Sequence, residues 1–555
     1  MRRRTVVVIG AGPSGLALTI ELGSRGIDCL LVERNDRVGY APRAKTTNVR
    51  TRTHLRRWGI ADRLAAVSPF GIDYPSTVAF VTRLGGFGLA KIEDASNCHP
   101  RRNELYPEHG QWVPQYKLEQ VMRDRAEELA SVDLRFSTEF VGVEQNADGA
   151  EIVLRDRVSG ETETIACDYV VGADGARSAL REAIGARMEG KYGLSRNYNI
   201  VFRAPGLADA HRHGPATMYW QVNPAAPSLT GPMDKNDVWF FMPTRLAEGF
   251  TITLENAGDL IRDAIGIETP LEVLSVDEWV ASSLIADKYR DGRIFLIGDA
   301  CHLHPPFGGY GMNMGVADGV DLGWKLAARI QGWGAGPLLD SYETERRTIH
   351  QEVIAEAAAN HAVLSNEFWA EGLEDDSPPG AAMRADVGER IVAIKRREFH
   401  TLKTVLGGCY ENSPVIAGEE RGTATDPDDR RYVPTSTPGC LAPHVWRADG
   451  RSLYDLFGLG FSLLVRFNAS GDQIRRATAA AAKRGIPLSV VYLTEADAAD
   501  RYPSALTLVR PDQHVAWRGS HWGDDVLDLV TGKAAGTQGV EAGSPGPVEL
   551  VGDAT

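Results

Sequence analysis

The stretch TVVVIGAGPSG, residues 5–15, decides the fold of this chain. Its first five residues form a short apolar run rich in β-branched side chains, which is typical of a buried parallel strand. The glycines then have the spacing G-x-G-x-x-G and lead into a segment with helical apolar spacing that ends at Gly26. A second apolar run, DCLLV at residues 28–32, ends at Glu33. Strand, glycine loop, helix, strand and acidic residue in this order predict a Rossmann-like unit that binds a dinucleotide.

The glycine loop predicts how the dinucleotide is held. Gly10 permits the tight turn, Gly12 lets the backbone approach a pyrophosphate, and Gly15 lets helix and strand pack closely. The helix N-terminus supplies free N–H groups for the phosphates, and Glu33 can accept hydrogen bonds from a ribose. The motif alone does not distinguish NAD from FAD, and a structural glycine turn is the alternative. The candidate cofactor-binding residues of this unit are Gly10, Gly12, Pro13, Ser14, Gly15, Glu33 and Arg34.

Two later stretches place an acidic residue and a glycine loop directly after a buried strand. They are DYVVGADGARSALR at residues 168–181 and GRIFLIGDACHLHPP at residues 292–306. The second continues through FGGYGMN into another helix. Asp174 and Asp299 are thereby placed to bind sugar or ribityl hydroxyl groups, and the later helix N-terminus can donate N–H groups to an anionic ring edge. The alternative is an ordinary turn in which each aspartate caps a helix.

Together, the glycine motif, the Asp174-Gly175 pair and the Gly298-Asp299 pair resemble the signature set of the FAD-dependent aromatic hydroxylases, the single-component flavoprotein monooxygenases. Residues 42–44 (PRA) and 115–118 (QYKL) resemble two further flavin-contacting segments of that family. The resemblance implies FAD as the cofactor. The residue contacts that it implies are Glu33 on the adenosine ribose, Arg43 and Gln115 near the flavin, Asp299 on the ribityl chain, Asp174 near FAD and the transient nicotinamide, and the backbone of Gly311, Met312 and Asn313 at the pyrimidine end of the flavin.

The resemblance also implies a reaction. NADPH or NADH reduces FAD, O₂ gives a flavin C4a-hydroperoxide, and one oxygen atom enters a phenolic or hydroxylated heteroaromatic ring. The partner would be a small aromatic substrate, in degradation or in natural-product tailoring, and the protein would be a homodimer. The alternatives are an inactive FAD-binding or assembly protein, and a flavoenzyme that uses the hydroperoxide for epoxidation or Baeyer–Villiger oxidation. The sequence identifies no group that deprotonates the substrate.

Residues 186–279 have a different character, with aromatic and β-branched runs separated by Pro, Gly and Asn turns. They predict an inserted, mostly antiparallel sheet that lines the substrate pocket together with parts of residues 70–112. Aromatic residues in such runs belong more often to a core than to a ligand site. The weak substrate-site candidates are Tyr219, Trp239, Tyr310, His211 and His213.

The predicted fold class is α/β, with several domains. A discontinuous Rossmann-like FAD-binding domain would span residues 1–185 and 280–365, around the inserted sheet, and a helical and loop linker would span 366–435. Residues 436–531 show the order βαβ–ββα and resemble the thioredoxin-like domain of the phenol hydroxylase or 2,4-dichlorophenol 6-monooxygenase branch, without a CxxC motif. A disordered tail is expected at 532–555.

Composition excludes other classes of protein. Sixty Lys and Arg against 74 Asp and Glu give the 555-residue chain a net charge of −14, which argues against a nucleic-acid partner. No apolar run reaches the roughly 20 residues of a membrane span, so no membrane partner is expected. Six cysteines without paired spacing indicate reduced thiols and a cytoplasmic protein. No residue pattern resembles a metal site.

Overall fold

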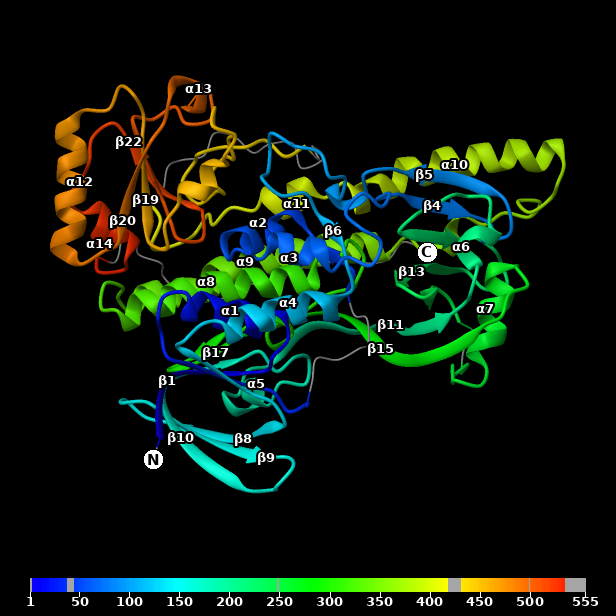
Figure 1. Cartoon of the computed structure of the whole chain (residues 1–555), viewed down its shortest axis with the longest axis horizontal. Helices are drawn as coiled ribbons and strands as arrows, with labels where there is room; N and C mark the ends of the chain where they lie inside the picture. The colour runs from blue at the N-terminus through cyan, green and yellow to red at the C-terminus, as the bar shows by residue number, and fades with distance from the viewer. Residues whose placement is uncertain (1, 37–43, 247–248, 418–430, 499, 535–555) are drawn as a thin grey trace, which may run out of the picture.

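The computed structural model describes residues 2–36, 44–246, 249–417, 431–498 and 500–534 (Figure 1). Two eight-stranded sheets, one four-stranded sheet and one two-stranded sheet organise this part of the chain. The predicted mixed α/β fold with several domains is confirmed. Among the described residues, no helix combines the length and the apolar character that crossing a bilayer requires.

The first eight-stranded sheet contains the predicted Rossmann-like unit. Its path runs β16-β17-β10-β1-β2-β7, and every neighbouring pair from β17 to β7 is parallel. Val6, Val7 and Val8 are completely buried in β1, as the apolar run predicts. The strands are β1 (Arg2–Ile9), β2 (Cys29–Val32), β7 (Val132–Arg135), β10 (Thr162–Gly172), β16 (Arg290–Asp291) and β17 (Ile294–Leu296), with β8 (Thr138–Gln145) and β9 (Ala150–Asp156) attached as an antiparallel hairpin.

Two helices stack above this sheet at very close range. Helix α1 (Pro13–Gly23) packs against α8 (Gly311–Ile330) and, on another side, against α4 (Gln115–Glu127) (Figure 1). A Cβ atom at Gly319 would lie 2.8 Å from the backbone of α1, and one at Gly323 would lie 2.5 Å from the Glu21 side chain. Glycine at these positions therefore lets the backbone of α8 reach that of α1.

The second eight-stranded sheet is buried on both faces. Residues alternate between the faces along each strand. Phe202, Tyr219 and Trp239 face one apolar cluster, together with α7 (Ala257–Ile265). Trp220 and Phe240 face the opposite cluster, together with α10 (Pro378–Phe399). The order is β18-β15-β11-β14-β13-β12-β4-β5, with bounds β4 (Val78–Val81), β5 (Gly88–Ile92), β11 (Met188–Arg203), β12 (Met218–Gln221), β13 (Ser228–Asp234), β14 (Val238–Pro243), β15 (Glu272–Ala286) and β18 (His302–Leu303).

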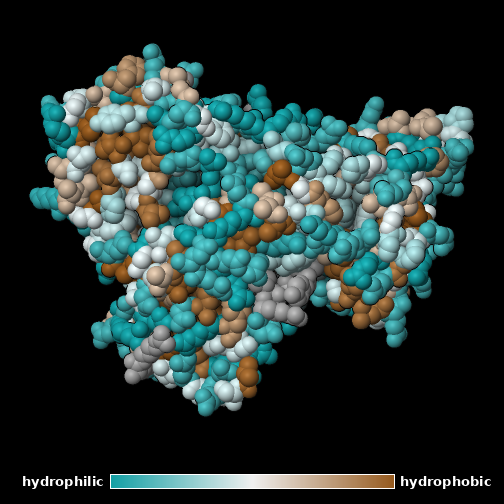
Figure 2. Space-filling model, viewed as in Figure 1, coloured by the Kyte–Doolittle hydropathy of each residue, from teal (hydrophilic) through white to brown (hydrophobic). Residues whose placement is uncertain are grey.

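The C-terminal sheet has the strand order β20-β19-β21-β22, with β19 and β20 parallel and the other pairs antiparallel. This is the arrangement that the order βαβ–ββα predicts for a thioredoxin-like fold. Its elements are β19 (Phe461–Val465), α12 (Gly471–Arg484), β20 (Leu488–Tyr492), β21 (Leu506–Val509), β22 (Val515–Gly519) and α14 (Val526–Val530). Phe461 packs against Trp324 of α8, with ring centroids 6.0 Å apart. In Figure 2 apolar side chains gather over this domain, while the rest of the visible face is mostly hydrophilic.

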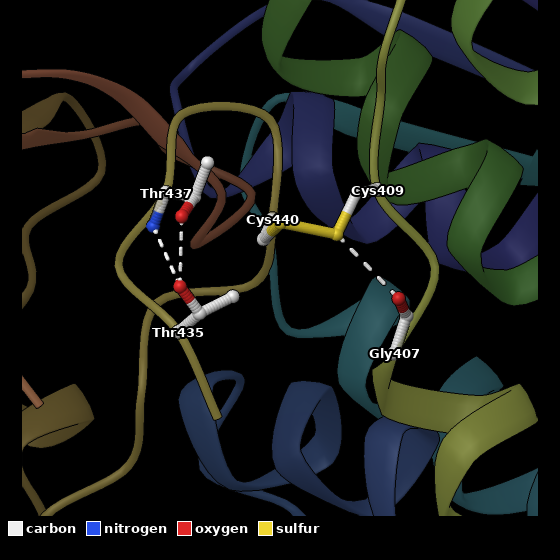
Figure 3. The surroundings of a disulfide bond; sticks show 5 residues. All are labelled: Gly407, Cys409, Thr435, Thr437 and Cys440. Atoms are coloured by element: carbon white, nitrogen blue, oxygen red, sulfur yellow. Dashed lines mark hydrogen bonds between the residues drawn. A yellow bond between two sulfur atoms is a disulfide. The ribbon is translucent and has the colours of Figure 1, made fainter. Parts of the chain in front are cut away.

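A disulfide joins the C-terminal domain to the preceding linker (Figure 3). Cys409 follows α11 (Leu402–Leu406), and Cys440 lies in the loop that enters the domain. The two residues face each other in an antiparallel bridge, in which Tyr410 N–H donates to the Gly439 carbonyl at 3.0 Å. The prediction of reduced thiols is therefore wrong for this pair, because the fold brings together two cysteines that the sequence separates by 31 residues. The other four cysteines are free and buried.

Candidate cofactor and substrate site

Two glycines of the first motif are required by the protein's own packing. Gly10 has a φ of +108° and lies against Ala173, whose N–H donates to the Ile9 carbonyl at 2.8 Å. A Cβ at Gly10 would overlap the Ala173 carbonyl, and one at Gly15 would overlap the Gly10 carbonyl. The glycine loop and the segment that contains Asp174 are thus in direct contact, although about 160 residues separate them in the sequence.

Gly12 differs from these two glycines. A Cβ at Gly12 would meet no heavy atom of the protein within 4 Å. Gly12 is the N-cap residue of α1 and Pro13 is the first helical residue, so the free N–H groups at the helix start lie beside this open space. Open space beside the N–H groups of a helix N-terminus can accommodate a diphosphate group.

Glu33 is held beside this open space. One carboxylate oxygen accepts from the Ala11 N–H at 3.0 Å, and the other accepts from the backbone and side-chain amides of Asn35 at 3.0 and 2.8 Å. The side chain therefore stands at the carboxyl end of β2, next to the glycine loop, as the motif predicts. The neighbouring Arg34 is exposed.

Asp174 has the helix-capping contact that the sequence offered as the alternative, and its contact with the cofactor stays a prediction. One carboxylate oxygen accepts from the Leu180 N–H at 3.2 Å and so helps to cap α5 (Ala179–Ala183). The other oxygen is buried and has no hydrogen-bond partner among the described residues. Arg181 connects this segment to the second aspartate motif, because its guanidinium donates to the Ala300 carbonyl at 3.0 Å and to the Ala176 carbonyl at 2.9 Å.

Asp299 lies at the carboxyl end of β17 and is exposed. It does not cap the following long helix, because α8 begins at Gly311 with Tyr310 as its N-cap residue. Gly298 has a φ of +60° and packs tightly against Ser14 at the start of α1. The three sequence motifs therefore meet around one helix N-terminus.

A buried carboxylate beneath this junction fixes the aspartate loop. Asp318 accepts from the Gly298 N–H at 3.0 Å, and from His302, His350 and Arg346 at 2.8, 2.9 and 2.8 Å. Burial raises the pKa of Asp318, but these three basic side chains outweigh it and hold the pKa well below its usual range. Asp318 thus stays ionised and anchors the loop that carries Asp299.

The start of α8 is connected to the segment after the second strand. The Asn313 side chain donates to the Thr46 and Gly309 carbonyls at 2.9 and 2.8 Å. Its oxygen accepts from the Asn48 N–H at 3.0 Å and from the Thr51 hydroxyl at 2.7 Å. Since these bonds use the side chain of Asn313, only its backbone and those of Gly311 and Met312 are left to face a ligand at the helix N-terminus.

A pocket lies where this segment meets the second sheet. Strand β3 (Thr46–Thr47) pairs with β6 (Gln111–Trp112), and the Gln115 N–H donates to the Ala44 carbonyl at 2.9 Å. Arg43 lies outside the described residues. The pocket is lined by Lys45, Phe70, Tyr74, Trp112, Val113, Pro114, Thr217, Pro232 and Met233.

The predicted substrate-site candidates do not line this pocket. Tyr219 and Trp239 stack at 6.2 Å on the opposite face of the sheet, and the Tyr219 hydroxyl donates to the Gly214 carbonyl at 2.6 Å. His211 contacts both rings, and burial lowers its pKa to about 4. His213 is also buried in this region. Tyr310 lines a different cavity, between α8, α9 (Gly336–His361) and the C-terminal domain. A role of these five positions in substrate binding stays a prediction, because the structure shows only that four of them pack against other side chains and that Tyr310 lines another cavity.

Lys45, Tyr74 and Met233 line this pocket and are not among the residues that the sequence analysis named. Lys45 directly follows the Pro-Arg-Ala segment, so a charged residue one position beyond a flavin-contacting motif was the available signal. Tyr74 and Met233 gave none, because they lie in a loop and at a strand end that only the folded chain brings together.

Comparison with known families agrees with this geometry. A sequence model of the FAD binding domain family matches residues 3–357, and one of the aromatic-ring hydroxylase C-terminal family matches residues 435–536. The chain belongs to the FAD-dependent aromatic-ring hydroxylases. This hydroxylase is therefore a flavoprotein monooxygenase that uses FAD, and NAD(P)H is the reductant typical of its family.

Several relatives align with the hydroxylase over nearly its full length. The tetracenomycin B2 monooxygenase-dioxygenase of Streptomyces olivaceus is 33% identical and is aligned over 95% of this chain and 97% of its own. The 2,4-dichlorophenol 6-monooxygenase of Delftia acidovorans is 28% identical, and the alignment covers 93% of this chain and 95% of that protein. A structure of the rebeccamycin biosynthetic enzyme RebC with reduced flavin superimposes with a TM-score of 0.88, at 32% identity over 96% of this chain and 99% of that one.

Proposed function

We propose that this hydroxylase binds FAD along the junction of the three motifs and inserts one oxygen atom into a hydroxylated polycyclic aromatic molecule during natural-product tailoring. The open space at Gly12 carries the cofactor part of the proposal, because no protein atom would obstruct a diphosphate there. The names of the relatives support the substrate class. They include a putative polyketide hydroxylase and the aklavinone 12-hydroxylase DnrF of Streptomyces peucetius, each 31% identical.

The cofactor-binding set follows from the positions described above. The N-terminus of α1, with Gly12, Pro13 and Ser14, would hold the diphosphate, and Glu33 the adenosine ribose. Asp299 would contact the ribityl chain, and the unpaired oxygen of Asp174 would accept a hydrogen bond from the cofactor. The remaining proposed contacts are Gly10, Gly15, Arg34, Arg43, Gln115, Gly311, Met312 and Asn313.

The pocket beside Lys45 encloses about 20 Å³, so it marks one apolar corner of the proposed substrate site. Bound FAD, reduced by NADH or NADPH in the presence of O₂, supplies the oxygen-transfer chemistry. The protein's contribution is to orient the ring and to exclude water, and the apolar walls of Phe70, Trp112 and Met233 suit both tasks. We also propose, from the family resemblance, a homodimer in the cytoplasm.

The test is to follow NADH and NADPH consumption in air by FAD-reconstituted protein, with simple phenols and with larger hydroxylated polycyclic aromatics. Stimulated consumption, with a product that has gained one oxygen atom from a polycyclic substrate, is the expected result. Preference for simple phenols would move the assignment to degradation. FAD binding without stimulation by any compound would reject the proposed reaction.

A further inference from the structure

The Cys409–Cys440 disulfide differs from the remaining cysteines in its access to solvent. Cys440 is buried, but Cys409 is half-buried and follows a pair of glycines in the linker. Thiol–disulfide exchange needs a thiolate and access to the sulfur that it attacks. Burial suppresses thiolate formation in the other four cysteines by raising the pKa of each thiol. They are Cys29 and Cys167, with a pKa of about 12, and Cys98 and Cys301. Cys409 is therefore the sulfur that an external thiol can reach.

The disulfide clamps the linker onto the C-terminal domain (Figure 3). Cys440 is fixed on the domain side, because its carbonyl accepts from the Val515 N–H of β22 at 2.9 Å. Cys409 and Tyr410 belong to the linker side. If the S–S bond is broken, the hydrogen bond from the Tyr410 N–H to the Gly439 carbonyl still joins the two segments. A backbone hydrogen bond of this kind contributes little net stability, so reduction gives the linker around Tyr410 more freedom.

Tyr410 connects this clamp to the cofactor side of the molecule. Its ring is buried in one apolar cluster with Tyr310, the N-cap residue of α8. Its hydroxyl accepts from the Arg346 guanidinium at 3.4 Å, and the same guanidinium donates to Asp318 at 2.8 Å. Asp318 in turn accepts from the Gly298 N–H at 3.0 Å. A chain of contacts thus runs from the residue next to Cys409 to the aspartate loop of the proposed FAD site.

A cavity at this joint leaves room for a second arrangement. It encloses about 60 Å³, and its wall includes Gly408 and Leu441, which flank the two cysteines. Tyr410 and Asn313, at the start of α8, line the same cavity. Close-packed interiors resist rearrangement, whereas side chains beside an enclosed space can shift without steric overlap. Movement of the linker can therefore reach the first turn of α8 as well as the aspartate loop.

We propose that Cys409 and Cys440 form a reversible thiol–disulfide site that controls FAD affinity, with tight binding in the oxidised protein and weaker binding in the reduced protein. A thiolate of a thiol reductant attacks the Cys409 Sγ atom, the S–S bond breaks, and Cys440 leaves as a thiolate that takes up a proton. A second reductant thiol then displaces Cys409. The pair gains two electrons and two protons, and the reductant becomes a disulfide. This inference rests on the proposed cofactor site, because it requires the Gly298 loop to contact FAD.

The direction of the effect follows from conformational order. In the oxidised protein the clamp already restricts Tyr410, whereas the reduced protein must order this region when FAD binds, which costs conformational entropy. Couplings between sites usually change affinity by roughly 5- to 150-fold. We expect about tenfold, because the contact between Arg346 and Tyr410 is long. By thermodynamic linkage, FAD must favour the disulfide over the two thiols by the same factor.

Two measurements on the full-length protein reconstituted with FAD test this coupling, at a temperature below both melting transitions. The first compares protein treated with oxidised and with reduced dithiothreitol, which is removed before serial dilution. Flavin fluorescence follows the release of FAD, and we expect the dissociation constant to rise about tenfold on reduction. The second measures, by thiol titration, the equilibrium of the cysteine pair with dithiothreitol, with and without excess FAD. FAD should shift this equilibrium towards the disulfide by the same factor.

Variants separate the covalent bond from its connection to the cofactor. The double variant Cys409→Ser, Cys440→Ser should bind FAD like the reduced wild type, whatever the reductant. Tyr410→Phe retains the disulfide but lacks the hydroxyl that contacts Arg346, so reduction should change its FAD affinity by less than about threefold. Tyr492→Phe, at an exposed tyrosine of β20, is the matched control and should show the full wild-type change. Circular dichroism shows that each protein is folded in both states.

The outcomes separate this inference from the proposed function. Equal FAD affinity of the oxidised and reduced wild type would overturn the inference and leave the proposed reaction intact. An equilibrium with dithiothreitol that is independent of FAD would also overturn it, because linkage requires both effects. A full change that persists in Tyr410→Phe would overturn the connection through Arg346. FAD affinity that depends on the disulfide, without hydroxylation of any aromatic compound, would reject the proposed reaction and leave this inference intact.

Discussion

At the scale of single residues, Gly12 and Lys45 are two positions whose residue type the packing of the protein does not explain. Gly10 and Gly15 are glycines because the protein's own backbone approaches them, whereas Gly12 faces open space. Lys45 shows the opposite situation, since it is a polar group that the fold would be more stable without. Both contrasts can be tested by substitution.

Gly12→Val should weaken FAD binding without unfolding the protein. Its side chain would project into the space beside the N-terminus of α1, where no protein atom lies within 4 Å. We expect FAD affinity to fall by roughly a hundredfold, which corresponds to about 2.7 kcal/mol, while the melting temperature of the apoprotein stays near that of the wild type. Flavin absorbance and circular dichroism measure the two effects. Gly10→Val is the contrasting variant and should lose stability itself, so equal melting of the two would contradict this distinction.

Lys45→Met should stabilise the ligand-free protein. The substitution removes a buried amine without hydrogen bonds, so we expect the free energy of unfolding to rise by about 1–3 kcal/mol. Burial lowers the folded-state pKa of Lys45 below the unfolded value of 10.5, so the unfolded chain binds the extra proton as pH falls through this window. The wild type thus loses stability from pH 10 towards neutral pH, and the advantage of the variant grows in the same direction. Urea unfolding of both proteins at pH 10 and at pH 7 measures the difference in their free energies of unfolding. A difference that is the same at the two pH values would contradict the lowered pKa of Lys45.

At the scale of elements, the site depends on how α8 is fixed to its neighbours. Its N-terminus is bound through Asn313 to the segment of β3, and its middle carries Asp318 beneath the aspartate loop. Its glycines allow close contact with α1. One helix thereby contacts the glycine motif and the aspartate loop at Gly298, while the Asp174 segment is linked to them through Gly10 and Arg181.

Asp318→Asn should loosen this arrangement. The substitution removes the charge that pairs with Arg346 and leaves that guanidinium buried and uncompensated, which costs about 3–5 kcal/mol. We expect a lower melting temperature and weaker FAD binding, because the Gly298 loop loses its anchor. Because the folded pKa of Asp318 is depressed, its contribution is complete above the unfolded value of 3.8 and is lost only as pH falls through the folded pKa. The control is Asp340→Asn. Asp340 lies on α9 and forms an exposed ion pair with Arg290 of β16, so its substitution should change the free energy of unfolding by less than about 1 kcal/mol. A similar effect of both substitutions would contradict a specific role for Asp318.

At the scale of the whole molecule, the C-terminal domain is joined to the FAD-binding part by ion pairs and packing, and to the preceding linker by a disulfide. Arg510, between β21 and β22, is completely buried and forms ion pairs with Asp321 of α8 and Glu345 of α9. The disulfide lies at the edge of the same interface, between Gly408 and Leu441 in the cavity wall. The thioredoxin-like domain is therefore a fixed part of the molecule.

Reduction of the disulfide should destabilise this interface. The bond closes a loop across a sequence separation of 31 residues, and in the chain-entropy model such a loop contributes about 3–4 kcal/mol. We expect dithiothreitol and Cys440→Ser to lower the melting temperature to a similar extent. Thiol titration of the denatured protein should find four free cysteines before reduction and six afterwards. Six thiols in the unreduced protein would show that the bond does not form.

Local sequence patterns were enough to predict the Rossmann-like unit and the order of the thioredoxin-like strands. These features depend on local patterns, such as glycine spacing and runs of apolar residues, which act between residues that are close in the sequence. The sequence did not determine the pocket beside Lys45, which is part of the proposed substrate site. Tyr219 and Trp239 were candidates because aromatic residues lie on both faces of a doubly buried sheet, and only strand register decides which face meets the cofactor segment. The pairing of Cys409 with Cys440 and the position of Lys45 over Phe240 likewise belong to tertiary structure, because each joins segments that have no local pattern in common.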